Sequence, residues 1–160
     1  MKNKFLIITG DPNSINSEII YKTWNKISNK TKKKIYLIGS YKLLSEQFKQ
    51  LRYKIKIKKV KNIDEKSKQT HLKILDIPLI FKNPFKIKST QASKYIIKSF
   101  NLAHTLAMQN KVKGIINCPI NKDLIKKTKK NGVTELLASK CELKPNSEVM
   151  MLYNKKLSVV

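Results

Sequence analysis

The segment V-K-G-I-I-N-C-P-I-N-K-D-L-I-K-K-T-K-K-N-G-V-T-E-L-L-A, residues 112–138, carries the clearest structural signal in this chain. Its apolar run at 114–118 stops at Pro119, and Asn121 and Lys122 follow before a lysine-rich amphipathic stretch. A strand that ends in proline and opens a helix places backbone N–H groups and a lysine at the carboxyl edge of a sheet. Open α/β sheets bind small anionic ligands at that edge. The segment therefore predicts a strand, a turn and a short helix beside an anion-binding site.

Outside this segment, strand and helix signals alternate along the chain. Strands are predicted at 5–9, 35–38, 53–58 and 114–118, and helices from about Ser17, over 44–51, from a cap at Ser89 or Thr90, after Asn121 and from about Thr134. This order predicts an α/β fold with a mostly parallel sheet and helices on both faces.

Three segments are predicted from more particular signals. The strict alternation over 53–58 predicts an edge strand with one solvent-facing side. Pro78 interrupts the apolar run at 72–81, which predicts an irregular or edge segment because proline cannot donate to a sheet ladder. Two further strands are predicted at 148–153 and 157–160. The chain ends inside this last apolar run, whereas termini are usually polar, so we expect either that this strand docks tightly or that the polypeptide is cut within a larger fold.

Length and composition indicate one globular unit. The chain has 160 residues, and 41% of them are hydrophobic, which is enough for a packed core. No apolar run approaches the roughly 18 residues of a membrane-spanning helix. Cys118 and Cys141 lack metal or redox spacing, so we expect a reducing, cytoplasmic location without a structural disulfide.

The net charge of +25 raises the question of nucleic-acid binding. Arg52 is the only arginine, although arginine is the residue best suited to bidentate phosphate and guanine contacts. The lysines are spread over the whole chain rather than gathered in one stripe. We interpret the charge as a lysine-coated surface, whose field would speed the approach of a phosphorylated ligand.

A few polar residues are candidates for a site, each with a competing structural role. Asp11 follows the first strand and either orients a ligand or satisfies a turn; we favour the turn. Asn121 is expected to cap a helix, with Lys122 facing a phosphate or carboxylate. Thr134 either contacts a ligand or caps a helix in whose first turn Glu135 lies, and the local sequence favours the cap. His71 and His104 lack metal spacing, and no dinucleotide or P-loop motif is present.

Four segments together resemble the 4-hydroxythreonine-4-phosphate dehydrogenase family. I-I-T-G-D-P-N-S-I-N-S-E-I-I at 7–20 resembles the family's T-x-G-D-P-A-G-I-G-P-E-I, and C-P-I-N-K at 118–122 resembles its x-P-I-N-K turn. G-V-T-E-L-L-A at 132–138 is similar to G-H-T-E-x-L-A, and V-M-M-L at 149–152 with L-S-V-V at 157–160 is similar to V-M-M-L…L-R-V. Their order and spacing agree over nearly the whole chain.

The resemblance implies a fold and a reaction. The fold is that of the isocitrate and isopropylmalate dehydrogenase group, with two α/β domains, and we expect the first domain at about 1–130 and the start of the second at 131–160. The reaction is NAD-dependent oxidation of 4-phosphooxy-threonine, with decarboxylation to an amino ketone phosphate on the way to pyridoxal phosphate. A divalent metal (zinc, magnesium or cobalt) polarises the alcohol and the ketone, and a homodimer completes each site.

This chain departs from the family at three places. Val133 replaces a histidine that contacts substrate, while Thr134 remains. Ser14, Asn16 and Ser17 replace Gly, Gly and Pro in the first motif. The family's metal-binding histidines lie beyond the segment that matches 157–160, so we expect no metal site and no turnover from this chain alone.

Two alternatives to a catalytic fragment remain open. One is a degenerate α/β domain that binds phosphorylated ligands without catalysis, which Val133 favours. The other is a basic nucleic-acid-binding domain, which the scattered lysines disfavour. If further chain covers the sheet in a longer protein, a large apolar patch should be exposed here and the isolated chain should aggregate or dimerise.

Overall fold

The computed structural model describes residues 3–65, 71–126, 132–141 and 147–160. Its centre is a sheet of five parallel strands in the order β3-β4-β2-β1-β5. The strands are β1 (Phe5–Ile8), β2 (Ile35–Gly39), β3 (Lys56–Val60), β4 (His71–Asp76) and β5 (Gly114–Asn117). The predicted α/β class and parallel sheet are therefore confirmed.

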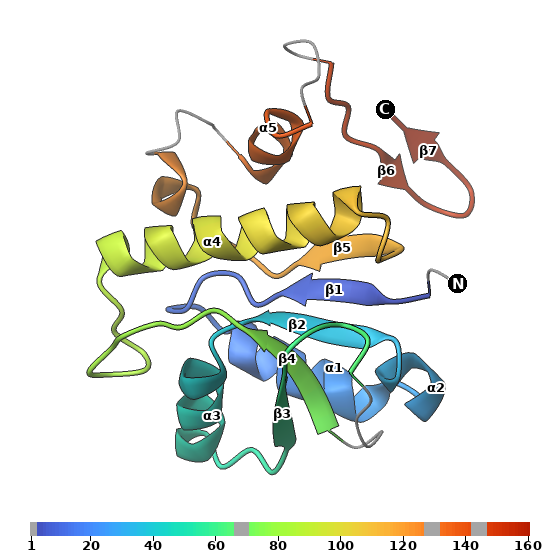
Figure 1. Cartoon of the computed structure of the whole chain (residues 1–160). Helices are drawn as coiled ribbons and strands as arrows, with labels where there is room; N and C mark the ends of the chain where they lie inside the picture. Colours follow the sequence, from blue (N-terminus) through green and yellow to red (C-terminus); the bar gives the residue numbers. More distant parts are fainter. Residues whose placement is uncertain (1–2, 66–70, 127–131, 142–146) are drawn as a thin grey trace.

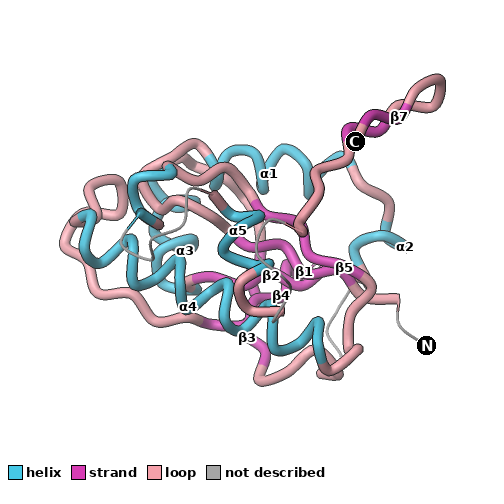
Figure 2. The backbone as a smooth tube through the Cα atoms, turned by 90° about the horizontal axis from the view of Figure 1, so that it is seen from above, coloured by secondary structure: helices cyan, strands magenta, loops and turns pink. Residues whose placement is uncertain are grey.

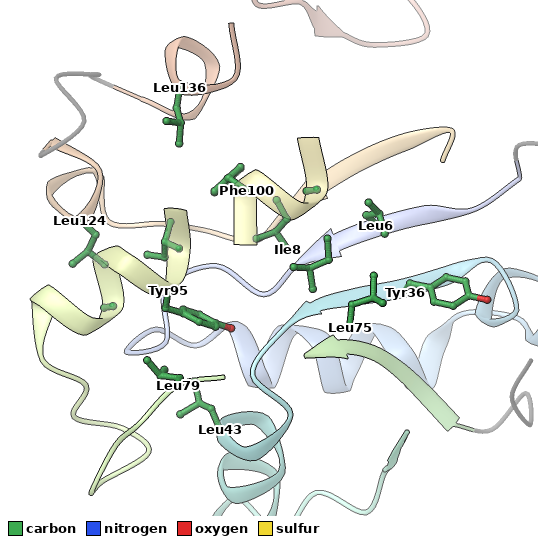
Figure 3. Packing of buried hydrophobic residues seen from close by; sticks show 14 of the residues in the cluster. Leu6, Ile8, Tyr36, Leu43, Leu75, Leu79, Tyr95, Phe100, Leu124 and Leu136 are labelled. Carbon is green, nitrogen blue, oxygen red and sulfur yellow. The ribbon is translucent and has the colours of Figure 1, made fainter. Parts of the chain in front are cut away.

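Helices cover both faces of this sheet (Figure 1). The helices of the chain are α1 (Asn16–Lys26), α2 (Asn29–Lys32), α3 (Tyr41–Gln50), α4 (Ser89–Met108), the 3-10 turn η1 (Lys122–Leu124) and α5 (Val133–Ala138), and Figure 1 shows α5 on the side of α4 that faces away from the sheet. On one face, α4 packs over the sheet, and Tyr95 and Phe100 of α4 join Leu6 and Ile8 of β1 in the larger core (Figure 3). On the other face, α1 and α3 build the second core around Trp24.

The strand order reverses at β1, which lies between β2 and β5. The chain passes from β1 to β2 through α1 on one face, and from β4 to β5 through α4 on the other. The turns that follow β1 and β5 therefore emerge side by side at the carboxyl edge. In open α/β sheets this topological switch point is the usual place for a ligand.

Two local predictions differ from the structure. The 72–81 segment was expected to be irregular or at an edge, but β4 is an interior strand between β3 and β2. Pro78 lies beyond the last strand residue, Asp76, so it removes no donor from the ladder. The N-cap of α4 is Lys88, without a side-chain hydrogen bond, so the predicted cap by Ser89 or Thr90 is wrong. The edge position predicted for 53–58 is confirmed, although β3 begins at Lys56.

The C-terminal residues form a small antiparallel hairpin of β6 (Leu152–Tyr153) and β7 (Ser158–Val159). Figure 2 shows it extending away from the main sheet, and its apolar side chains are exposed. The predicted domain boundary near residue 130 falls within 127–131, outside the described residues, and stays a prediction. No helix in the described parts of the chain is long and apolar enough to cross a membrane.

An apolar groove of about 310 Å³ lies between α1 and the sheet, beside the edge strand β5. Ile7, Ile19, Ile116 and Cys118 are among the residues that line it, and Ile116 is 52% exposed. Parallel sheets are normally covered on both faces, so this is an unusual exposure of sheet surface.

Candidate functional site

The turn after β1 is joined to the turn after β5 by the side chain of Asn16. Its Nδ2 donates to the carbonyl oxygens of Thr9 at 2.9 Å, Asp11 at 3.3 Å and Pro119 at 2.9 Å. Pro119 is 103 residues away in sequence, and Asn16 is only 3% exposed. Because all three acceptors are carbonyls, the amide orientation is fixed: turning it over would bring oxygen against oxygen. Oδ1 has no hydrogen-bond partner among the described residues.

Gly10 makes this close approach of the two turns feasible. Its φ is +73°, a region in which residues with a Cβ are strained. A Cβ there would also lie 2.6 Å from both the Asn16 Nδ2 and the Pro119 carbonyl oxygen. Glycine is therefore needed here for both conformation and space.

Asp11 lies at the junction of the two turns and is half-buried. Its backbone N–H donates to the Pro119 carbonyl at 3.2 Å, and its Oδ1 accepts from the Asn13 N–H at 2.9 Å. The second bond is the local turn role that the sequence favoured. The first ties its main chain to the turn that leads to Asn121 and Lys122.

The outer side of the β1 turn is held by further side chains that stand where the family motif has small residues. Asn13 exchanges two hydrogen bonds with the main chain of Ile87, at 2.9 and 2.7 Å. Ser14 Oγ donates to the Asp11 carbonyl at 2.9 Å. Neither Ser14 nor Asn16 has a positive φ, so the loss of glycine at these positions costs no backbone strain.

Beneath the two turns, a buried hydroxyl network connects α4 to the strand ends. The Tyr95 hydroxyl lies 2.6 Å from Thr9 Oγ1 and accepts from the Ser40 N–H at 3.0 Å. Burial raises the pKa of Tyr95 above its ordinary value, so this phenol stays protonated and serves as a neutral hydrogen-bonding group. The network therefore fixes the strand end from which the β1 turn begins.

The turn after β5 presents a lysine at the carboxyl edge. Asn121 caps η1 by accepting from the Asp123 N–H at 3.0 Å, as the sequence predicts. Lys122 follows and its side chain is exposed. Lys126, one turn further, is instead paired with Asp123 at 2.6 Å.

The segment containing Thr134 lies on α5. Gly132 is the N-cap and makes no side-chain bond, so the expected cap by Thr134 is wrong; Thr134 is exposed within the first turn. Glu135 lies in that first turn as predicted. Val133 packs against the larger core, and Leu136 is part of it (Figure 3). In the described parts of the chain, no hydrogen bond joins Thr134 or Glu135 to Asp11, Asn121 or Lys122.

Among the residues that the structure describes, the remaining reactive side chains do not form a metal centre. No three His, Cys, Asp or Glu side chains within the described ranges could hold a metal ion together. His104 Nε2 lies 3.5 Å from Cys141 Sγ, and His71 lies far off in sequence at the start of β4. Burial raises the pKa of the Cys118 thiol to about 11, so it remains protonated at neutral pH.

Sequence reasoning found the two turns but missed the residues that join them. Asn16 was noticed only as a replaced glycine, and Tyr95 was not noticed at all. A signal for Asn16 was present, because a polar side chain at a helix start beside a glycine turn often bonds to nearby main chain. Nothing local marks Tyr95, whose partners lie 86 and 55 residues away.

Comparisons with known proteins agree on one family. Residues 30–160 match the family described as pyridoxal phosphate biosynthetic protein PdxA. The 4-hydroxythreonine-4-phosphate dehydrogenase of Aquifex aeolicus is 32% identical over 162 aligned residues, covering 100% of this chain and 49% of that protein. A protein provisionally named D-threonate 4-phosphate dehydrogenase, from Fusobacterium nucleatum, is 31% identical over 146 residues, 86% of this chain and 43% of the relative.

Solved structures give the same result. The crystal structure of a 4-hydroxythreonine-4-phosphate dehydrogenase from Burkholderia phymatum superposes with a TM-score of 0.84 at 25% identity, over 99% of this chain and 48% of that one. This chain therefore spans about half the length of the relatives it matches.

Proposed function

This chain belongs to the PdxA family of pyridoxal phosphate biosynthetic proteins, and we propose that it supplies the substrate-binding edge of a 4-hydroxythreonine-4-phosphate dehydrogenase. The observation that carries the proposal is the pair of turns at the sheet's switch point, joined by the Asn16 amide to the Pro119 carbonyl. Those turns hold Asp11 and Lys122 at the edge where α/β sheets bind anions.

The proposed reaction is the one that the family resemblance implies. In that reaction the secondary alcohol of 4-phosphooxy-threonine would be oxidised by loss of a hydride and a proton, and the resulting β-keto acid would lose carbon dioxide to give an amino ketone phosphate. NAD, when bound, would supply the oxidising chemistry by accepting the hydride. This chain's part in the proposal is to bind and orient the phosphorylated substrate.

In this proposal the candidate residues either contact the substrate or support the turns that do so. The exposed ammonium of Lys122 pairs with the substrate phosphate, and Asn121 holds Lys122 by capping η1. The Thr134 hydroxyl donates to the substrate, and Glu135 and Asp11 support their respective turns. Val133 offers no hydrogen bond where the family has histidine, so substrate binding should be weaker than in relatives that keep it.

The described residues do not supply a ligand set for the divalent metal that the resemblance implies. We place those ligands in polypeptide that corresponds to the second half of the relatives, along with the rest of the second domain. The homodimer is likewise part of the proposal. The proposed roles of the residues in this chain do not involve a metal.

The substrate-binding role can be tested by calorimetric titration of the purified chain with 4-phosphooxy-L-threonine. Lys122→Ala should weaken binding about tenfold, the cost of one charge-assisted hydrogen bond. Lys126→Ala is the matched control, because Lys126 is also exposed but already paired with Asp123. Val133→His should tighten binding. Equal affinities for the Lys122 and Lys126 variants would count against the assigned phosphate contact.

Val133 also favours a second candidate, a binding domain of the same family that has lost catalysis. The two candidates differ in turnover rather than in binding. The purified chain is expected to produce no NADH with substrate, NAD and a divalent metal, and metal-dependent NADH production would refute that expectation. The intact mass of the native product then separates the two: a longer product that carries further histidines indicates a working dehydrogenase, and an 18.5 kDa product indicates the binding domain.

A further inference from the structure

We propose that Asn16 is a positioning residue, which fixes Asp11 relative to the turn that presents Asn121 and Lys122. The role as a positioning residue for substrate binding rests on the proposed function, but the mechanical coupling of the two turns does not. It is a feature of this chain rather than of the motif it resembles, where glycine stands at this position.

The geometry argues that Asn16 does more than fill space. One NH₂ group with two hydrogens serves three carbonyl oxygens, at 2.9, 3.3 and 2.9 Å, from both sides of the switch point. Buried hydrogen bonds of this kind are costly to leave unmade. The lack of a Cβ at Gly10 permits this close approach, because a Cβ there would lie 2.6 Å from both the Asn16 Nδ2 and the Pro119 carbonyl oxygen.

The link acts directly on the candidate site. The Asp11 carbonyl accepts from Asn16, while the Asp11 N–H donates to the same Pro119 carbonyl that Asn16 binds. Pro119 is two residues from Asn121 and three from Lys122 in sequence. Release of the amide would leave the 3.2 Å bond from the Asp11 N–H to the Pro119 carbonyl between the two turns. We therefore expect the turns to separate more readily while the strands beneath them remain paired.

An isosteric substitution separates hydrogen bonding from packing. Asn16→Asp keeps the shape but sets an oxygen against three carbonyl oxygens, whereas Asn16→Ala removes the group altogether. If the hydrogen-bond donor is what matters, the free energy of unfolding should fall further in Asn16→Asp than in Asn16→Ala. A side chain that served only to fill volume would give the opposite order, with Asn16→Ala worse.

Amide hydrogen exchange by NMR measures the coupling itself. In Asn16→Ala, and in Asn16→Gly, which restores the motif residue, exchange of the Asp11 N–H should accelerate at least about tenfold, while that of Phe100 in the core of α4 stays nearly unchanged. Equal acceleration at both amides would show an effect on global stability alone and would overturn the proposal. These two variants keep the test open if the Asp variant does not fold.

A double-mutant cycle in substrate binding then tests the positioning of Lys122. In the Asn16→Ala background, Lys122→Ala should cost clearly less than about tenfold, because the lysine is no longer held at the substrate. An undiminished loss would overturn positioning even if exchange at Asp11 accelerates. If the parent chain does not bind 4-phosphooxy-L-threonine at all, the proposed function fails, while the exchange result still decides whether Asn16 couples the two turns.

Discussion

The hydroxyl group of Tyr95 lies 2.6 Å from Oγ1 of Thr9, so α4 is hydrogen-bonded to the carboxyl end of β1. The same hydroxyl accepts from the backbone N–H of Ser40, which follows β2. One phenol on one face of the sheet thus holds the ends of two adjacent strands, directly beneath the candidate site.

Removal of this hydroxyl should destabilise the fold. Tyr95→Phe leaves the buried N–H of Ser40 without its partner, and we expect the free energy of unfolding to fall by about 1–3 kcal/mol. Urea titration followed by circular dichroism measures it. Tyr153→Phe is the control, because Tyr153 is 75% exposed and its loss should matter little. Equal effects of the two substitutions would argue against the network.

The tight geometry of the β1 turn can be tested by comparing a glycine in that turn with a glycine outside it. Gly10→Ala places a Cβ 2.6 Å from the Pro119 carbonyl oxygen at a φ of +73°, so it should cost more than about 1–2 kcal/mol. Gly114→Ala meets nothing closer than 3.9 Å, from the Phe5 ring, and should be nearly neutral. Thermal unfolding of both variants checks this contrast, and a tolerated Gly10→Ala would mean that the turn can open without cost.

Lys73 should make stability depend on pH. Burial, with the nearby charge of Lys4, lowers the pKa of Lys73 from 10.5 to about 8. Its Nζ donates to the Lys33 carbonyl at 2.6 Å and lies 3.8 Å from the centre of the Tyr36 ring. Because the folded pKa is the lower one, the unfolded chain binds more protons between pH 8 and 10.5, and stability from this group rises with pH in that window.

Comparison with Lys73→Met isolates this contribution. The difference in unfolding free energy between Lys73→Met and the parent should shift by about 2 kcal/mol in favour of the parent between pH 7 and pH 9.5. Urea titrations at the two pH values measure the shift. A constant difference would show that Lys73 titrates normally in the folded chain.

The apolar groove beside β5 should drive self-association. Ile116 is 52% exposed within it, and we expect Ile116→Lys to reduce association measured by sedimentation velocity over a range of concentrations. Ile80→Lys is the control, since Ile80 is 83% exposed but does not line the groove. If both variants associate like the parent, some other surface is responsible.

The parts of this fold that follow from local signals could be predicted. The apolar runs that form β1, β2 and β5 and the Asn121 cap depend on residues close in sequence, and the sequence predicted all of them, although β5 is an edge strand that is not buried. The interior position of β4 was missed because Pro78 was assigned to the strand, whereas it lies just after it. The order of the strands, which decides that β4 is interior, is a long-range property.

The hydrogen bonds that join the parts of the site could not be predicted from the sequence, for the same reason. The bond from Asn16 to Pro119 spans 103 residues, and that from Thr9 to Tyr95 spans 86. A hydrogen bond of this kind leaves no periodicity or spacing that a pattern could detect. The family resemblance includes both turns, but the family motif has glycine where this chain has Asn16, whose amide connects them.

Binding of the phosphorylated substrate tests the central claim most directly. Isothermal titration of the purified chain with 4-phosphooxy-L-threonine, beside 4-hydroxy-L-threonine without its phosphate, compares ligands that differ only in the anion. The account predicts saturable binding of the phosphorylated compound, weakened by Lys122→Ala, and no measurable binding of the other. Absence of binding by the phosphorylated compound, or equal binding of both, would contradict the assignment of this sheet edge as the substrate phosphate site.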